Sequence, residues 1–135
     1  MKKKQVKLEI PVEQASYYAI SCSSSLHQLS WELNAKVRID LRENFSISLG
    51  GVEFPTAKDE HSSIDRTILI VKNRVDASIL IKELPNIDYV VKIQGSHQKD
   101  FIKGFIAEIK KFASVVAAIP VDAAKVKGIS ILQNI

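Results

Sequence analysis

Several short stretches of the chain alternate apolar and polar residues with a period of two, or consist of brief apolar runs. Both patterns are typical of strands. On this basis strands are predicted at residues 6–12, 17–21, 45–49, 52–54, 67–71, 77–81, 89–93 and 115–120. The Gly-Gly pair at 50–51 favours a two-residue hairpin turn, because glycine readily adopts positive φ angles. Asn73 and Asp76 also suit a turn, so residues 67–71 and 77–81 are predicted to pair as a second hairpin.

Two longer segments carry apolar residues at helical spacing. The first runs from about residue 25 to 35, and the serines at positions 23 to 25 offer N-caps. The second runs from about residue 98 to 112, with an apolar face and its lysines mostly outward. Asp122 is expected to cap a short closing helix. The polar stretch at residues 55–65 is expected to be a mobile solvent loop.

Residues 89–93 are apolar, or long enough to cover apolar surface, at nearly every position. Such runs are typical of strands buried on both faces, near the centre of a sheet. With the helix and strand that follow, residues 88–120 form a strand–helix–strand unit, and its crossover should be right-handed if the strands are parallel. Residues 1–135 are therefore predicted to be one α+β domain. It has a largely antiparallel sheet with two main helices on one face, and its second half is ferredoxin-like.

Charge and composition exclude several classes of protein. The formal net charge is +4, but Lys2, Lys3 and Lys4 contribute three of these charges, so the body of the domain is nearly neutral. Residues 1–4 are expected to be a disordered basic tail, and no basic stripe interleaved with aromatic residues points to nucleic acid. No apolar run approaches the roughly 20 residues that cross a bilayer. With a lone Cys22 and no recognisable export signal, we expect the cytoplasm as the default compartment.

The segment from Ile81 to Tyr89, I-K-E-L-P-N-I-D-Y, offers the strongest candidate residues. In the favoured interpretation it is structural: the Asp88 carboxylate accepts backbone N–H groups from a neighbouring turn, for which the turn at Asn73 is the candidate, and the Tyr89 hydroxyl needs a buried partner. In the functional interpretation, Glu83 and Asp88 form a carboxylate pair in a cleft beside Tyr89, available for acid–base work or a cation.

The other reactive residue types form no recognisable catalytic or metal-binding motif. His27, His61 and His97 are dispersed, without the spacing of a metal site. Cys22, whose neighbours on the predicted helix are apolar, is expected to be a buried structural thiol. There is no nucleophile elbow around the serines and no glycine-rich phosphate loop, so no catalytic residue, metal or cofactor is assigned.

Trp31 is the candidate for partner binding, because it lies off the apolar stripe of its helix, one turn after His27. We favour the interpretation that a loop covers it. The alternative is an apolar patch of Trp31, His27 and their neighbours that serves in homodimerisation or ligand binding.

The nonapeptide resembles the signature of the IPExxxVDY family of small uncharacterised bacterial proteins. Lys82 stands in place of the first proline of that signature and Ile87 in place of its valine, while the three-residue gap is intact. The resemblance extends to Ile20-Ser21-Cys22, to the helix with Trp31, and to the second helix and the strand that ends at Pro120, and so covers nearly the whole chain. It implies membership and no activity.

These observations support two hypotheses about function. The first is a non-enzymatic cytoplasmic domain that binds a protein partner, regulates one, or self-associates as a homodimer. The second is a small-molecule-binding protein or minor enzyme, with a cleft near Glu83, Asp88 and Tyr89.

Overall fold

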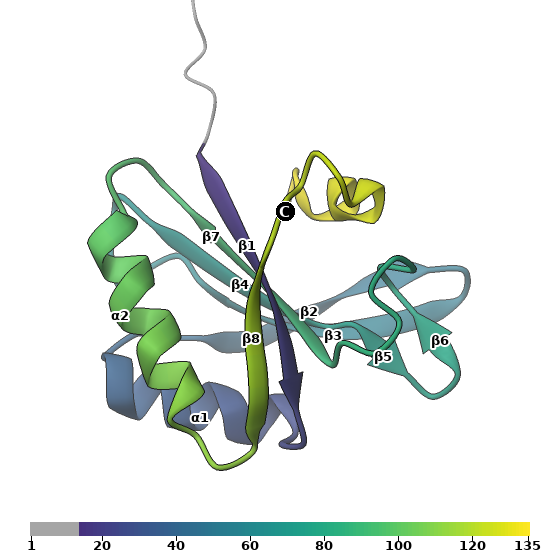
Figure 1. The fold of residues 1–135 in the computed structure, drawn as a ribbon, viewed down its shortest axis with the longest axis horizontal. Coiled ribbons are helices and arrows are strands. Elements are labelled where there is room, and N and C mark those ends of the chain that lie inside the picture. The colour runs from purple at the N-terminus through teal and green to yellow at the C-terminus, as the bar shows by residue number, and fades with distance from the viewer. Residues whose placement is uncertain (1–13) are drawn as a thin grey trace, which may run out of the picture.

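Six strands form one sheet, in which every pair of neighbouring strands is antiparallel (Figure 1). Their spatial order is β2 (Arg42–Leu49), β3 (Val52–Asp59), β4 (Thr67–Lys72), β7 (Tyr89–Gln94), β1 (Ala15–Cys22) and β8 (Val115–Val121). The computed structural model describes residues 14–135. The strand predicted at 6–12 and the tail at 1–4 lie outside the described residues. The predicted α+β class, with its antiparallel sheet, is confirmed.

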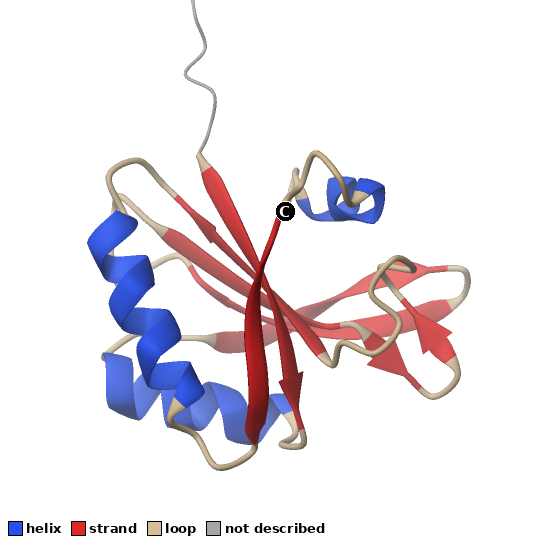
Figure 2. Cartoon of the chain, viewed as in Figure 1, coloured by secondary structure: helices blue, strands red, loops and turns tan. Residues whose placement is uncertain are grey.

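Helices α1 (Leu26–Val37) and α2 (Lys99–Lys110) lie on one face of the sheet (Figure 2). The Ser25 side chain caps α1 by accepting a hydrogen bond from the Gln28 N–H at 3.1 Å, and Arg38 ends the helix in the left-handed conformation. Both helices share a hydrophobic core with the sheet. Their buried side chains in this core include Leu29, Leu33, Phe105 and Ile109. None of the helices between residues 14 and 135 is long and apolar enough to cross a membrane.

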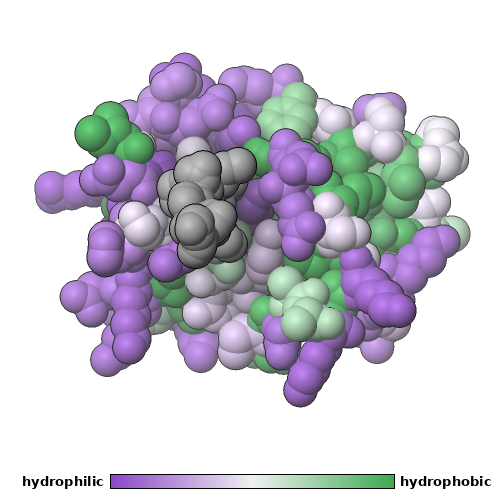
Figure 3. Space-filling view, turned by 90° about the horizontal axis from the view of Figure 1, so that it is seen from above, coloured by the Kyte–Doolittle hydropathy of each residue, from purple (hydrophilic) through white to green (hydrophobic). Residues whose placement is uncertain are grey.

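The opposite face of the sheet packs against the 3₁₀ helix η1 (Lys127–Leu132) and against residues 80 and 81. Ile129 and Leu132 of η1 are fully buried there. Lys92 of β7 is also buried, and its ammonium donates to the backbone oxygens of Leu132, at 2.7 Å, and Gln133, at 3.3 Å. In the view from above, exposed apolar side chains gather in the right half of the molecule, the half in which η1 lies (Figure 3).

β7 lies between β4 and β1 and is buried along almost its whole length, which confirms the predicted central strand. β7 and β8 both pair antiparallel with β1 and therefore run parallel to each other, with α2 as their connection. β1 separates the two, as in the split strand–helix–strand unit of ferredoxin-like folds. The hairpin at Gly50 and Gly51 is also confirmed, with φ angles of 59° and 80°.

The second predicted hairpin is wrong. β4 pairs with β3 and β7, whereas β5 (Arg74–Val75) and β6 (Ser78–Ile79) form a small separate sheet around Asp76, whose φ is 54°. The cause is the buried side chain of Asn73, which accepts a hydrogen bond from the Ile81 N–H at 2.8 Å and donates to the backbone oxygens of Leu84 and Ile87. These bonds turn the following segment away from the edge of β4, which β7 already occupies.

Two further boundaries differ from the sequence expectation. The predicted loop at 55–65 is wrong for its first five residues, because β3 continues to Asp59. Pro55 has no N–H group to donate to a neighbouring strand. The strand tolerates it on the β4 side, because the pairing of β3 with β4 begins only at Thr56. Asp122 does cap a turn, accepting a hydrogen bond from the Ala124 N–H at 3.0 Å, but the closing helix η1 begins only at Lys127.

Candidate functional site

Asp88, in the segment 81–89, joins the entrance of β7 to the end of β1. Its carboxylate accepts a hydrogen bond from the Cys22 N–H at 2.8 Å, and the Arg74 guanidinium lies 3.8 Å from its other oxygen. The expected role as an acceptor of backbone N–H groups is confirmed, although the donor is Cys22. The Asn73 N–H instead donates to the backbone oxygen of Asp88, at 2.9 Å.

The buried Tyr89 ties the same segment to the turn before α1. Its hydroxyl donates to the backbone oxygen of Ser24 at 2.6 Å. Burial above all, with smaller contributions from Cys22, Asp88 and Glu43, raises the pKa of Tyr89 to about 12. The hydroxyl therefore stays protonated at neutral pH and acts as a donor to Ser24 rather than as a base.

Glu83, at the other end of the segment, is exposed and holds η1. Its carboxylate accepts a hydrogen bond from the Gly128 N–H at 3.2 Å, in the first turn of that helix. The approach is close, because a Cβ atom at Gly128 would lie 2.7 Å from the Glu83 carboxylate and 3.0 Å from the Ile81 side chain. Glu83 is thus an anchor for η1.

The segment 81–89 does not bring Glu83, Asp88 and Tyr89 to one cavity. Each of the three side chains hydrogen-bonds to a different part of the chain, namely η1, the end of β1 and the turn before α1. None of them lines the groove along α2 described below or the smaller cavity beside residues 133–135. The carboxylate pair of the functional interpretation is therefore not formed by Glu83 and Asp88, and these contacts support the favoured structural interpretation.

Trp31 is 63% exposed on α1, so the expectation that a loop covers it is wrong. His27, one turn earlier, is also exposed, and its Nδ1 lies 3.0 Å from the carboxylate of Glu43 on β2. Trp31 and His27 therefore lie together on an accessible surface.

The remaining reactive residue types do not gather. His61 lies in the loop after β3 and His97 in the loop before α2, far along the chain from His27 on α1. Among the described residues, no three His, Cys, Asp or Glu side chains are grouped so that they could hold a metal ion. Cys22 is buried, as expected for a structural thiol, and its sulfur lies 3.5 Å from the Ser114 hydroxyl.

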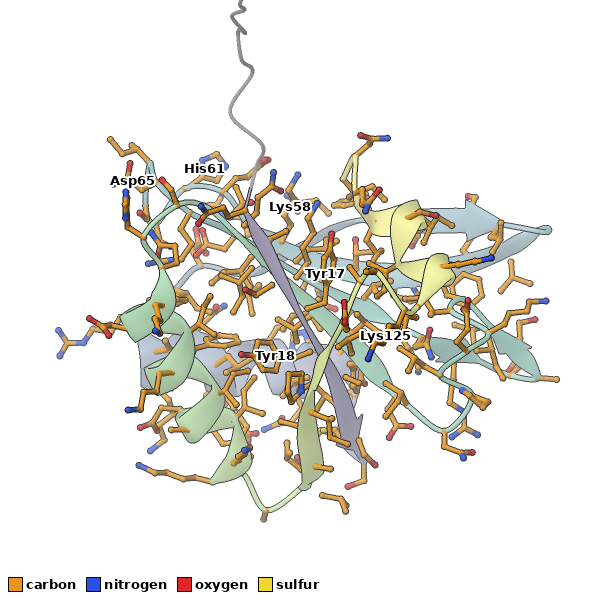
Figure 4. The ribbon with its side chains drawn as sticks, turned by 45° about the horizontal axis from the view of Figure 1, so that its top comes forward. Tyr17, Tyr18, Lys58, His61, Asp65 and Lys125 are labelled. Carbon is orange, nitrogen blue, oxygen red and sulfur yellow. The ribbon has the colours of Figure 1, made fainter. Side chains whose placement is uncertain are left out.

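A groove of about 780 Å³ lies between α2 and the neighbouring strands β1 and β8. Tyr18 of β1 lies between α2 and the strands, whereas its neighbour Tyr17 lies on the side of η1 (Figure 4). The apolar part of the groove's lining comes from both the helix and the strands: Tyr18, Ile102, Ile106, Ala107, Ala118 and Pro120. We call this set the apolar floor.

Lysine side chains line the groove along the whole length of α2. Lys99, Lys103 and Lys110 are all exposed, and none of them makes a hydrogen bond or ion pair within residues 14–135. We call these three residues the lysine rim. The acidic residues of α2, Asp100 and Glu108, do not line the groove, and no other carboxylate of residues 14–135 does. Within the described part of the chain, the groove therefore combines an apolar floor with positive charge that no lining carboxylate balances.

The sequence alone does not reveal this groove, because lysines on an amphipathic helix are typical of a solvated outer face. The signal was present in their spacing: Lys99, Lys103 and Lys110 recur at intervals of four and seven, which places them on one side of a helix, next to Ile102 and Ile106. What the sequence did not provide was the position of β1 and β8 beneath that side.

The sequence matches no protein-family model and no curated protein. The resemblance to the IPExxxVDY family therefore remains a prediction, and the groove has to be interpreted from its own geometry.

Proposed function

We propose that this protein is a non-enzymatic binding domain of the cytoplasm, and that its groove holds a segment of a partner protein in which apolar and acidic side chains alternate. The observation that carries this proposal is the lysine rim above the apolar floor. The cytoplasmic placement is supported by a single cysteine that is buried and unpaired.

The distribution of charge favours a peptide over a compact anion or a fatty acid. A fatty acid has one anionic group and would need cations at one end of the groove only. The lysine rim instead extends over residues 99–110, a rise of about 16 Å along a helix. An extended peptide covers that distance with about five residues. Several carboxylates on one peptide can therefore pair with several lysines.

The spacing of the lysine rim also fits an extended peptide. Side chains on one face of a strand repeat about every 6.7 Å. Lys99 and Lys103 are separated along α2 by a rise of about 6 Å. Two acidic residues two positions apart can therefore meet both lysines, while the residue between them turns toward Ile102 and Ile106. Apolar contact then supplies affinity, and the charges supply orientation and selectivity.

The same lining favours binding over catalysis. Among the residues of 14–135 that line the groove, the ionisable groups are His97, the three lysines and the Tyr18 hydroxyl. A proton-transfer reaction between two matched groups needs an acid and a base within hydrogen-bond reach of the substrate. The only cysteine of the chain is buried at the opposite end of β1, where it contacts Ser114.

The proposal is tested by fluorescence anisotropy with labelled octapeptides and the full-length protein. One peptide alternates leucine and glutamate, a second alternates leucine and lysine, and a third has the composition of the first in two blocks. We expect the Leu-Glu peptide to bind best, with an affinity that falls as salt is added. Equal binding of all three peptides, or binding to none, would contradict the proposal.

Matched charge substitutions locate the binding site. Lys103→Glu should weaken binding of the Leu-Glu peptide by about five- to thirty-fold, because reversing an exposed charge removes an attraction and adds a repulsion. Ala107→Glu, on the exposed side of α2 within the groove, should weaken it in the same direction. Lys125→Glu makes the same charge change beside η1 and should leave binding unchanged (Figure 4). Binding that instead responds to Trp31→Ala would assign the partner to α1.

A further inference from the structure

The first residues of the chain carry the pattern of side chains that the groove along α2 is suited to bind. Residues 8–13 read Leu-Glu-Ile-Pro-Val-Glu, so apolar residues at positions 8, 10 and 12 alternate with Glu9, Pro11 and Glu13. The chain has two carboxylate side chains before residue 14, and both belong to this segment. The protein thus contains within itself a segment of the same chemistry as the proposed ligand.

This segment joins the described part of the chain at the groove itself. Gln14, the residue that follows Glu13, lines the groove. The backbone oxygen of Gln14 accepts a hydrogen bond at 2.8 Å from the N–H of Gly95, which also lines the groove. β1 and α2 begin at the same end of the sheet (Figure 1). The chain connection therefore keeps residues 8–13 close to the Lys99 end of the lysine rim.

The segment is long enough to reach the lysine rim. Each residue of an extended chain adds about 3.3 Å, so Glu9 reaches up to about 17 Å from Gln14. Between Lys99 and Lys103, α2 rises by only about 6 Å. A reversal of the chain just before Gln14 is therefore enough to bring the carboxylate of Glu9 to Lys103.

Charge and backbone chemistry also favour this contact. Residues 8–13 contain no basic side chain, and no carboxylate of residues 14–135 lines the groove beside the lysine rim. Pro11 has no N–H group for a strand ladder, but a contact made through side chains does not need one. The lysines that precede the segment, at positions 2–4 and 7, weaken the attraction. The contact is therefore one that a partner segment can displace.

We propose that residues 8–13 bind in the groove of their own molecule, and that a partner segment has to displace them. This inference rests on the proposed function, because it assigns a regulator to the same groove. A segment of the same chain has a high effective concentration at the groove, so weak contacts are sufficient to hold it. The apparent affinity for a partner is then reduced in proportion to the fraction of molecules whose groove is open.

The first test reverses the charge of the segment in the full-length protein and measures binding of the Leu-Glu octapeptide by fluorescence anisotropy. Glu9→Lys combined with Glu13→Lys should release the segment. The control, Glu53→Lys combined with Glu60→Lys, makes the same change in net charge at two exposed residues outside the groove. Both proteins share any general attraction to an acidic peptide. The segment variant should bind about three- to tenfold more tightly than the control. Equal affinities overturn the proposal.

Nuclear magnetic resonance without any partner peptide tests the contact itself. The backbone amide signals of Lys99 and Lys103 should differ between the parent protein and the segment variant. Adding the free peptide Leu-Glu-Ile-Pro-Val-Glu to the variant should move them towards their positions in the parent. Identical signals in the two proteins overturn the proposal. A difference that grows with protein concentration would show that the segment comes from a second copy, and would overturn the intramolecular contact.

The two proposals fail separately. If the Leu-Glu octapeptide binds and Lys103→Glu weakens it, while the segment variant behaves like its control, the groove is a binding site that residues 8–13 do not regulate. If no octapeptide binds, the proposed function fails, and the amide signals of α2 still decide whether the segment contacts the groove.

Discussion

The carboxylate of Asp88 and the backbone N–H of Cys22 meet at 2.8 Å, although 66 residues separate them in the chain. This bond joins the first residue before the central strand β7 to the last residue of β1. It explains why an acidic residue lies at the entrance of a buried strand without any catalytic partner. The segment 81–89 is a junction between β1, the turn at Asn73 and η1.

Removing the Asp88 carboxylate should destabilise the fold. We expect Asp88→Ala to lower the free energy of unfolding by about 1–3 kcal/mol, because the Cys22 N–H loses its acceptor. Asp88→Asn keeps an acceptor oxygen and loses only the distant contact with Arg74, so it should cost clearly less. Urea unfolding followed by circular dichroism measures both. Equal stability of Asp88→Ala and the parent protein would refute the structural role.

Tyr89 should make stability depend on pH in alkaline solution. Its folded pKa of about 12 lies above the ordinary value of 10. Its contribution is therefore fully present below about pH 10 and is lost as the pH rises towards 12. The loss should reach about 2–3 kcal/mol. Burial also raises the pKa of Tyr17, so the measurement is the difference between the parent protein and Tyr89→Phe. The parent should lose more stability above pH 10, and parallel pH profiles would contradict the assignment.

Two glycine-to-alanine substitutions should have opposite effects. Gly95→Ala places a Cβ atom 2.1 Å from the Asp65 backbone oxygen at a φ of 145°, so it should destabilise strongly, by more than about 2 kcal/mol. Gly104 lies within α2 with open space around it, so Gly104→Ala should stabilise by about 0.5–1 kcal/mol. Thermal unfolding of both variants checks the prediction, and the same sign of change for both would contradict it.

The exposure of Trp31 predicts its fluorescence. A side chain that is 63% exposed should emit at long wavelength and be quenched readily by acrylamide. The emission should stay constant over a range of protein concentrations if α1 remains uncovered. A shift to shorter wavelength at high concentration would show that a second copy covers Trp31. Emission already at short wavelength in dilute solution would contradict the exposed position.

Local signals in the sequence predicted much of the fold. The serine cap of α1, the Gly-Gly hairpin and the apolar run of β7 each depend on neighbouring residues, and each is found in the structure. The hairpin expected at residues 67–81 fails because it is decided by a distant contact. The buried Asn73 side chain binds residues 81, 84 and 87, and β7 occupies the edge of β4 where the second strand would have paired.

The candidate sites divide in the same way, into features that neighbouring residues determine and features that depend on contacts between distant segments. Asp88 and Tyr89 stood out as unusual polar residues at a buried strand, and their anchoring role could be anticipated. The groove depends on segments that meet only in the fold, α2 with β1 and β8. The structural role of Asp59 also depends on contacts that form only in the fold. Its buried carboxylate accepts hydrogen bonds from the N–H groups of Asp40 and His61, which lie in two different loops.

A charge exchange across the groove tests the proposed function most directly. The affinities of the parent protein and of Lys103→Glu are measured for the Leu-Glu and the Leu-Lys octapeptides, at low and at moderate salt. A peptide in contact with the lysine rim predicts a reversal: the parent prefers the Leu-Glu peptide, and Lys103→Glu gains affinity for the Leu-Lys peptide while it loses affinity for the other. If Lys103→Glu keeps the same order of preference with the same ratio as the parent, the groove is not the binding site.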